Sequence, residues 1–458
     1  MVSIYDALER IKGRVTETVS EDLIRQVCEE VGHPWRDRAL NPIITTHLFL
    51  QQILHGNTAC SHLRHLSGLS FTDSAYCQAR RRLPLAMLER LQRAVTLRLF
   101  SVDEAHPAET YWRGHRTFLI DGSSFSMPDT PALQKHFGQP GGQALGCGFP
   151  TAHLMVLFDA AEGYLLKTLA LPLRTHDVSQ AAAMHAALRP DDVLIGDRAF
   201  GSFAHLVLCQ KRQIHGLFRA HQRQIISFRP GRRHARQAKK KQHPKGRKRR
   251  TGLPTSRWIK RLGKHDQLVE YFKPKECPAW MTAEDYDKLP PSIVVRELRY
   301  VVRERSRTRV VTVVTTLLDP IRYPAAELAR LYGIRWQVET NLKHLKQTMK
   351  MDILHCKSVA GVLKELTLFV LVYNLVRRVM LEASHRQHVA LNRISFIDAW
   401  RWLRYARPGD ELPHLIVNPH RPGRAEPRVR KRRPKEFPVM KKPRKELREA
   451  LFRKQHAA

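Results

Sequence analysis

Residues 332–346 read YGIRWQVETNLKHLK, a stretch that predicts a helix with charged groups along one face. At about 100° per residue, five polar side chains of this helix fall within an arc of roughly 80°. They are Tyr332, Arg335, Glu339, Lys343 and Lys346. A surface helix with a Glu339–Lys343 pair one turn apart would show the same pattern. The helix therefore needs partners elsewhere in the chain before it indicates a site.

Two aspartates that follow short apolar runs are candidates for those partners. Asp121 follows Thr117–Ile120, and Asp197 follows Val193–Gly196. Each run predicts a buried strand, and the first is expected to end in a turn at Asp121-Gly122. Open α/β sheets place their sites at such strand ends. Together with Glu339, the aspartates form a candidate set of three carboxylates.

Three carboxylates of this kind suit two divalent metal ions about 3.5–4 Å apart, which support phosphoryl transfer. Mg²⁺ is the expected ion, because it is held by few carboxylates together with waters and phosphate oxygens. Mn²⁺ can take its place. The neighbouring cations would hold phosphates, and the Arg335 guanidinium can do so with two parallel hydrogen bonds.

The charge of the whole chain points to the same kind of partner. Its 458 residues include 79 Lys or Arg and 42 Asp or Glu, a formal net charge of +37. Such an excess predicts a polyanion, most often nucleic acid. Residues 229–252 hold twelve Lys or Arg and no acid, and residues 421–458 hold fifteen against four Glu. A membrane-surface protein is the competing class, but the sequence shows no long amphipathic helix and no lipidation site.

The sequence also predicts the compartment. The first residues lack the apolar core of a signal peptide. The longest apolar run, Leu366–Val376, is too short to span a membrane and predicts a buried helix. The seven cysteines form no C-x-x-C pair and no Cys/His zinc spacing. We therefore expect a cytoplasmic protein without a disulfide framework.

Hydrophobic periodicity separates a helical N-terminal part from a mixed α/β part. Helices are expected at Tyr5–Val15, Glu21–Val31, Pro42–Leu54, Pro84–Phe100 and Ala181–Leu188, and in a long zone from Ala325 to Glu382. Further strands are expected at His153–Phe158, Tyr164–Leu173, Ile293–Val302 and Val310–Leu318. The basic stretch 74–82 predicts a helix that either lies in a DNA groove or is a solvated basic face.

The order of these motifs resembles the DDE transposases of bacterial insertion sequences, above all the insertion-sequence-four (IS4-like) family. The helix matches that family's Y-x2-R-x3-E-x6-K signature at Tyr332, Arg335, Glu339 and Lys346. Asp121-Gly122 and the Asp197–Phe200 motif come in the family's order. The stretches CQARRRLP (77–84) and EPRVRKRRPK (426–435) extend the resemblance over nearly the whole chain.

The resemblance implies an α/β fold with an RNase H-like catalytic core that is interrupted by a β-rich insertion. The expected parts are a helical domain at 1–108 that binds DNA ends, a first part of the core at 109–214, the insertion with its basic segment at 215–324, a second part of the core at 325–400 with Glu339, and a basic tail at 401–458.

The resemblance also implies roles for the site residues. Asp121, Asp197 and Glu339 would be catalytic and hold two Mg²⁺ ions. Tyr332, Arg335 and Lys346 would grip the phosphates of the transposon end. Trp336 and Lys343, on the same predicted helix, are further candidates for binding DNA. Related enzymes flip a base onto a Trp during hairpin formation, and Trp258 and Trp280 are candidates for that role by location.

The expected function is cut-and-paste transposition. The protein would bind the terminal inverted repeats of an insertion sequence and pair them as a homodimer on double-stranded DNA. Two alternatives stay open: a structure-selective nuclease or resolvase on the same fold, and an inactive DNA-binding protein derived from a transposase. Since all three predict salt-sensitive DNA binding, binding alone does not separate them.

Overall fold

The structure is a computed structural model. It describes residues 18–36, 38–103, 111–175, 177–221, 224–235, 252–304, 307–406, 410–417 and 440–456. The helix expected at Tyr5–Val15, most of the basic segment 229–252 and residues 418–439 of the tail lie outside these ranges.

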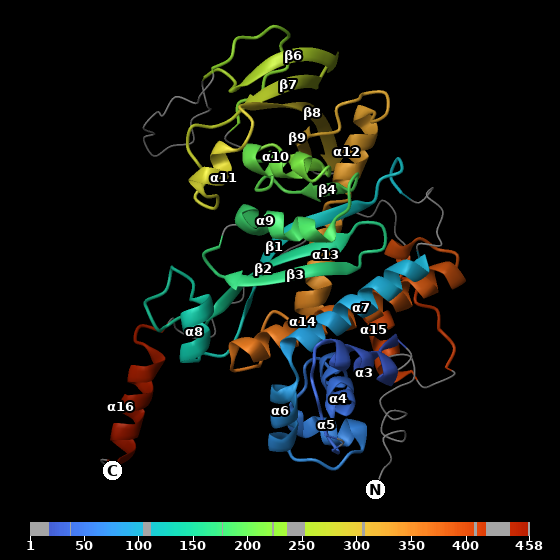
Figure 1. The fold of residues 1–458 in the computed structure, drawn as a ribbon, viewed down its shortest axis with the longest axis vertical. Coiled ribbons are helices and arrows are strands. Elements are labelled where there is room, and N and C mark those ends of the chain that lie inside the picture. The colour runs from blue at the N-terminus through green and yellow to red at the C-terminus, as the bar shows by residue number, and fades with distance from the viewer. Residues whose placement is uncertain are drawn as a thin grey trace.

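A nine-stranded mixed sheet runs from the middle to the upper end of the molecule in Figure 1, which confirms the α/β class. The strand order is β3-β2-β1-β4-β5-β9-β8-β7-β6. Strands β1, β2 and β3 are antiparallel, whereas β4 is parallel to β1 and β5 is parallel to β4. Strands β6 to β9 continue the same sheet as an antiparallel set through the pairing of β5 with β9. The bounds are β1 Thr117–Ser126, β2 Thr151–Asp159, β3 Leu165–Pro172, β4 Val193–Gly196, β5 His215–Arg219, β6 Ser256–Gly263, β7 Asp266–Phe272, β8 Ser292–Glu304 and β9 Arg307–Thr315.

The turn expected at Asp121-Gly122 is wrong, because β1 continues through it to Ser126. Asp121-Gly122 suggested a turn, but the backbone of these residues and of the polar residues after them pairs with β2 in unbroken antiparallel register. That pairing supplies the hydrogen bonds that hold the chain extended. Only the parallel partner β4 ends here, at Gly196. Asp121 therefore lies within β1, beside the end of β4.

Helices cover both faces of the sheet. On one face Phe118 and Ile120 pack in a core with residues of α9 (Asp177–Met184) and α10 (Phe203–Lys211). On the other face Leu119 belongs to the larger core, which includes α7 (Leu85–Asp103) and α14 (Val359–Arg386). Because neighbouring residues of a strand point to opposite faces, side chains two positions apart on β1 share a face.

The N-terminal helices lie below the sheet in Figure 1. They are α3 Glu21–Glu30, α4 Pro42–Leu54, α5 Cys60–Ser67, α6 Asp73–Arg82 and α7. Helix α4 has the predicted bounds, since the Asn41 side chain caps it and Pro42 begins it. The eight-residue α5 was not predicted, although its apolar side chains Cys60, Leu63 and Leu66 recur every three residues and pack in one cluster. Helix α6 confirms a helix over the basic stretch 74–82, and whether it enters a DNA groove stays a prediction.

The long helical zone expected from Ala325 to Glu382 is broken into segments. Helix α12 (Ala325–Gly333) is followed by α13 (Trp336–Lys343), a π-helical turn (His344–Thr348) and then α14. Between α12 and α13, the amides of Ile334 and Arg335 bond to carbonyls three residues back, which tightens the helix. A left-handed residue, Lys350 at φ +67°, lies in the connection to α14.

Helix α14 is a core element that extends well beyond the predicted apolar run. It is long and apolar enough to cross a membrane by length and composition alone, but 72% of its most apolar window is buried inside the protein. The buried Asn374 amide bonds to the backbone of Leu165 on β3 at 2.8 and 3.0 Å. This burial confirms the prediction of a buried helix around Leu366–Val376.

The expected basic tail at 401–458 contains ordered helix. Helix α15 (Phe396–Tyr405) crosses the expected boundary at residue 400. Residues 444–456, a run rich in Glu, Lys, Arg and Leu that favours helix, form α16 (Arg444–His456). Arg444 anchors α16 by an ion pair with Asp129 at 3.1 Å and by contact with the Phe149 ring. The remaining helices are α8 Pro131–Phe137 and α11 Ala283–Asp287.

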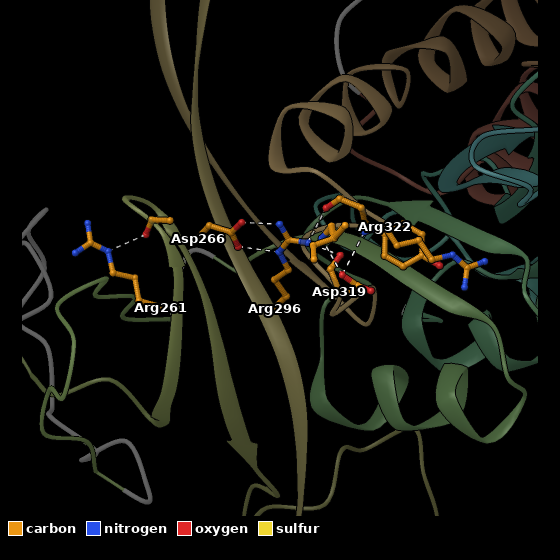
Figure 2. Close-up of polar contacts among 8 residues, drawn as sticks. Arg261, Asp266, Arg296, Asp319 and Arg322 are labelled. Carbon is orange, nitrogen blue, oxygen red and sulfur yellow. Dashed lines mark hydrogen bonds and ion pairs between the residues drawn. The ribbon is translucent and has the colours of Figure 1, made fainter.

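A buried ion pair joins the outer strands to the chain that leads into α12 (Figure 2). The Arg296 guanidinium is fully buried on β8 and pairs with Asp266 of β7 at 2.5 Å. It also donates to the carbonyl oxygens of Tyr323 at 2.8 Å and Asp319 at 3.3 Å. Asp319 in turn accepts from the amides of Ile321 and Arg322. The loop before α12 is thus fixed to the sheet.

We predict that Arg296→Met destabilises the protein by about 3–5 kcal/mol, because it leaves Asp266 buried without its cation. Lys288→Met is the matched control, since Lys288 pairs with Glu284 on an exposed surface and its loss should cost at most about 1 kcal/mol. Urea unfolding followed by circular dichroism measures both. Equal losses for the two variants would contradict the bracing role of Arg296.

Candidate catalytic site

The pairing of β1 with β4 brings the two aspartates to one place. Leu119 pairs with Ile195 in parallel register, and each aspartate comes two residues later in its chain. Leu119 and Ile195 both belong to the larger core. By the alternation of strand residues, Asp121 and Asp197 should point to the same face as these two. That face carries α13, which packs against β1.

Backbone amides orient both carboxylates. One Asp121 oxygen accepts from the N–H of Gly122 at 2.9 Å. One Asp197 oxygen accepts from the N–H of Ala199 at 2.7 Å, in the turn that follows β4. Such local bonds between an aspartate and the following backbone are typical of turns. They fix each carboxylate relative to the sheet.

Arg335 links the sheet to the helix that carries Glu339. Its guanidinium lies 2.9 Å from a Glu339 oxygen and 4.0 Å from an Asp121 oxygen. The Arg335 side chain is 13% exposed, whereas that of Glu339 is 47% exposed. Burial alone would lower the pKa of Arg335, but the hydrogen bond to Glu339 and the charges nearby outweigh burial and raise that pKa. Arg335 is therefore a fixed cation between two carboxylates.

The Tyr332 hydroxyl is a buried polar group that has no hydrogen-bond partner among the residues that the structure describes. Tyr332 is 6% exposed, and burial is the main cause that raises the pKa of its phenol. The Arg335 and Arg219 charges oppose this rise, and Asp197 adds to it. A buried hydroxyl without a partner costs free energy, and such groups are rare in native proteins. A ligand oxygen at this position would satisfy it.

Lys346 and Trp336 extend the site on two sides. The Lys346 ammonium lies on the π-helical turn and donates to the Ser123 hydroxyl of β1 at 3.0 Å. Its burial lowers the pKa of Lys346. Trp336 is 51% exposed, with the Arg335 guanidinium 4.9 Å and the Arg309 guanidinium 6.0 Å from its ring. Lys343 is exposed on α13.

The five predicted helix residues do not share one continuous exposed face. Tyr332 belongs to α12 and is buried, and Arg335 lies at the junction before α13. The tightened junction and the π-helical turn change the rotation per residue, so an ideal-helix projection fails here. Among the described residues, two sets of three side chains have metal-ligand atoms that all lie within 4.8 Å of one another, and Asp121, Asp197 and Glu339 belong to neither set. Instead, the Arg335 guanidinium lies between Asp121 and Glu339.

The two tryptophans predicted by location differ in their surroundings. Trp258 lies on β6, six strand steps from β1 in the sheet order, which is about 29 Å at the usual strand spacing. Trp280 is half-buried against the core on the α10 side. Trp336 is the tryptophan next to Arg335.

Sequence reasoning missed three polar residues that the fold brings to this region. Ser123, two residues after Asp121 on β1, accepts from Lys346. Arg219 of β5 and Arg309 of β9 lie on strands that join the insertion to the rest of the sheet. No motif marks these arginines, so only the strand pairing reveals them.

Comparisons with known proteins identify a family, a relative and a solved structure that this chain is similar to. A family model described as "Transposase DDE domain" matches residues 112–375. The transposase InsG for insertion sequence element IS4 of Escherichia coli (strain K12) is 27% identical over 395 residues, which cover 81% of this chain and 78% of that protein. The solved structure of a piggyBac transposase synaptic complex with hairpin DNA is 12% identical with a TM-score of 0.42, over 88% of this chain and 80% of that one.

We predict that Arg335→Ala strengthens Mn²⁺ binding at least about 3-fold, because it removes a cation that competes for Asp121 and Glu339. Arg330→Ala, on the exposed surface of α12, is the matched control and should leave the affinity unchanged. Electron paramagnetic resonance of free Mn²⁺ measures both. Weaker binding by the Arg335 variant would show that the guanidinium does not occupy the place of an ion.

Proposed function

This chain belongs to the family of transposases with a DDE domain, and we propose that it cuts and rejoins DNA at the carboxylates that its β1–β4 pairing aligns. The family match covers 112–375, from before β1 into α14. The protein is an IS4-like DNA transposase, a polynucleotidyl transferase. We also propose that it belongs to the subgroup marked by Tyr332, Arg335, Glu339 and Lys346.

The strand arrangement supports an RNase H-like core. We assign this core to strands β1–β5, in which three antiparallel strands adjoin two parallel ones. This assignment moves β5 (His215–Arg219) from the expected insertion at 215–324 into the core. Strands β6–β9 stay within the insertion and are joined to the core through the pairing of β5 with β9. On this assignment the insertion extends the catalytic sheet instead of forming a separate one.

Transposases of this family use divalent metal ions, and we propose Mg²⁺, two per site, held by Asp121, Asp197 and Glu339. The donor set fits, because hard oxygen ligands suit Mg²⁺ and the Arg335 cation already lies against two of these carboxylates. When bound, the ions would activate a water or a 3′-hydroxyl and stabilise the leaving oxygen.

The surrounding side chains would hold the DNA. The unpartnered Tyr332 hydroxyl can donate to a phosphate oxygen. Arg335 can turn from Glu339 to a phosphate with both guanidinium nitrogens, and Lys346 is held at the site by Ser123. The exposed Trp336 ring offers a surface on which a displaced base can stack. Exposed Lys343 adds a sequence-independent phosphate contact.

The substrate we propose is double-stranded DNA that carries the terminal inverted repeats of the protein's own insertion sequence. Two copies of the chain would pair two such ends, cut them and join the free 3′-hydroxyls to target DNA in the cytoplasm. The basic segments 229–252 and 421–458 would supply much of the DNA affinity, since together they hold 27 Lys or Arg and four Glu.

We predict that Asp121→Asn and Glu339→Gln lower cleavage of a labelled transposon end by on the order of 100-fold or more, the effect of losing a group that stabilises the transition state. Binding of the end should survive. The exposed Glu284→Gln of α11 is the matched control and should cleave normally. Cleavage by the Asp121 variant at the wild-type rate would sink the assignment.

A precleaved end with a free 3′-hydroxyl separates the proposal from its alternatives. A transposase joins this end to a target plasmid, a structure-selective nuclease or resolvase cleaves without joining, and an inactive derivative does neither. The terminal repeats for the assay come from the DNA that flanks the gene. Cleavage without any joined product would replace the proposed function with the nuclease.

We also predict that Lys343→Ala weakens end binding and reduces the slope of log affinity against log salt by about 0.9, the value for one phosphate contact. The matched control is Lys288→Ala in the insertion, which pairs with Glu284 and should leave the slope unchanged. Fluorescence anisotropy across a salt series measures both slopes. Identical slopes for the Lys343 variant and the wild type would exclude a phosphate contact.

A further inference from the structure

Three ligand-type side chains meet in a buried position on the other face of the sheet. They are His185, in the 3-10 turn after α9, and His205 and Cys209, one turn apart on α10. All three are at most 1% exposed. The Nε2 atoms of the two histidines lie 2.9 Å apart, and the Cys209 Sγ lies 3.9 Å from each of them. Three donor atoms thus converge on one point.

The orientation of His205 is fixed by the backbone. Its Nδ1 lies 2.7 Å from the Phe200 carbonyl oxygen, which can only accept, so Nδ1 carries the proton. Nε2 therefore presents a lone pair to His185 and Cys209. A histidine that donates its second ring nitrogen to a carbonyl in this way is typical of metal ligands.

The distances fit a single ion. Zinc binds imidazole nitrogen at about 2.0–2.1 Å and thiolate sulfur at about 2.3 Å. With those bond lengths, the observed separations correspond to angles of roughly 90° between the nitrogens and roughly 130° between sulfur and nitrogen. A mixed nitrogen and sulfur set without carboxylates favours zinc over Mg²⁺.

We propose that His185, His205 and Cys209 bind one zinc ion. Binding replaces the thiol proton of Cys209, which leaves to solvent as the sulfur bonds to the ion. The second His-containing cluster among the described residues is a poorer candidate. There both ring nitrogens of His115 are engaged by the Asp191 carbonyl oxygen and the Tyr323 hydroxyl, and the Asp191 side chain is 79% exposed.

The zinc site would brace the segment that carries Asp197. The ion would join the turn after α9 to α10, and His205 reaches back to Phe200, three residues after Asp197. The loop between β4 and α10 would then be held at both of its ends, by the β1–β4 pairing and by the ion. The sequence shows no zinc motif here, because His185 is twenty positions from His205 and the ligand pair on α10 is a bare H-x3-C.

The test is the zinc content of the full chain, grown with zinc and dialysed against excess Mg²⁺ so that ions on the carboxylates exchange. We expect one zinc per chain in the wild type, and less than about a tenth of that in Cys209→Ala and His205→Asn. Cys28→Ala is the matched control, since Cys28 is also a buried free thiol but lies on α3. Wild-type protein without zinc, or a Cys209 variant that keeps it, would overturn the proposal.

Cobalt keeps the test decisive if a variant fails to fold. Wild-type protein loaded with Co²⁺ should show a thiolate-to-cobalt charge-transfer band that Asp121→Ala retains, since the carboxylate site has no sulfur. Cys60→Ala should retain the band as well, which excludes the Cys60–Cys77 thiol pair of α5 and α6, whose sulfurs lie 3.8 Å apart. No such band in the wild type, or its loss in the Cys60 variant alone, would contradict zinc at His185, His205 and Cys209. Neither measurement uses DNA, so the outcome is independent of the proposed transposition activity.

Discussion

The parallel pairing of β1 with β4 is the constraint on which the candidate site depends. Its register pairs Leu119 with Ile195. Asp121 and Asp197, 76 positions apart in the chain, each come two residues after this pair and so lie beside each other in the fold. A shift by one residue in either strand would turn one aspartate to the opposite face. The buried apolar residues before each aspartate hold the register, since Leu119 and Ile195 pack in the same core. Core packing thus sets the geometry of the candidate site.

Helices α12 and α13, on the face of the sheet that carries Leu119, complete the candidate site with the positive charge of Arg335. Arg335 lies at the tightened junction between α12 and α13, where its guanidinium reaches both Asp121 on the sheet and Glu339 on the helix. Without a cation, the carboxylates would repel one another in a partly buried position. The arginine offsets that repulsion in the protein alone. A guanidinium that can exchange carboxylates for phosphates suits an enzyme that must bind ions and a polyanion at the same place.

The sequence was sufficient where local patterns decide the structure. The apolar run before Asp197 predicted a strand end correctly, and the capped helix at Pro42–Leu54 has its predicted bounds. The sequence was insufficient where a residue far away in the chain decides the local structure. The polar residues after Asp121 remain in β1 because β2 pairs with them. The contact of Lys346 with Ser123 depends on the π-helical turn, which no sequence periodicity predicts.

The central claim is that Asp121, Asp197 and Glu339 form one ion-binding site at the end of β4. The most direct measurement is anomalous diffraction from crystals of the protein bound to a transposon end and soaked in Mn²⁺. The account predicts Mn²⁺ peaks coordinated by all three carboxylates, with the Arg335 guanidinium moved from Glu339 to a phosphate. Peaks that exclude Asp197 or Glu339, or an Arg335–Glu339 pair that persists beside bound ions, would contradict it.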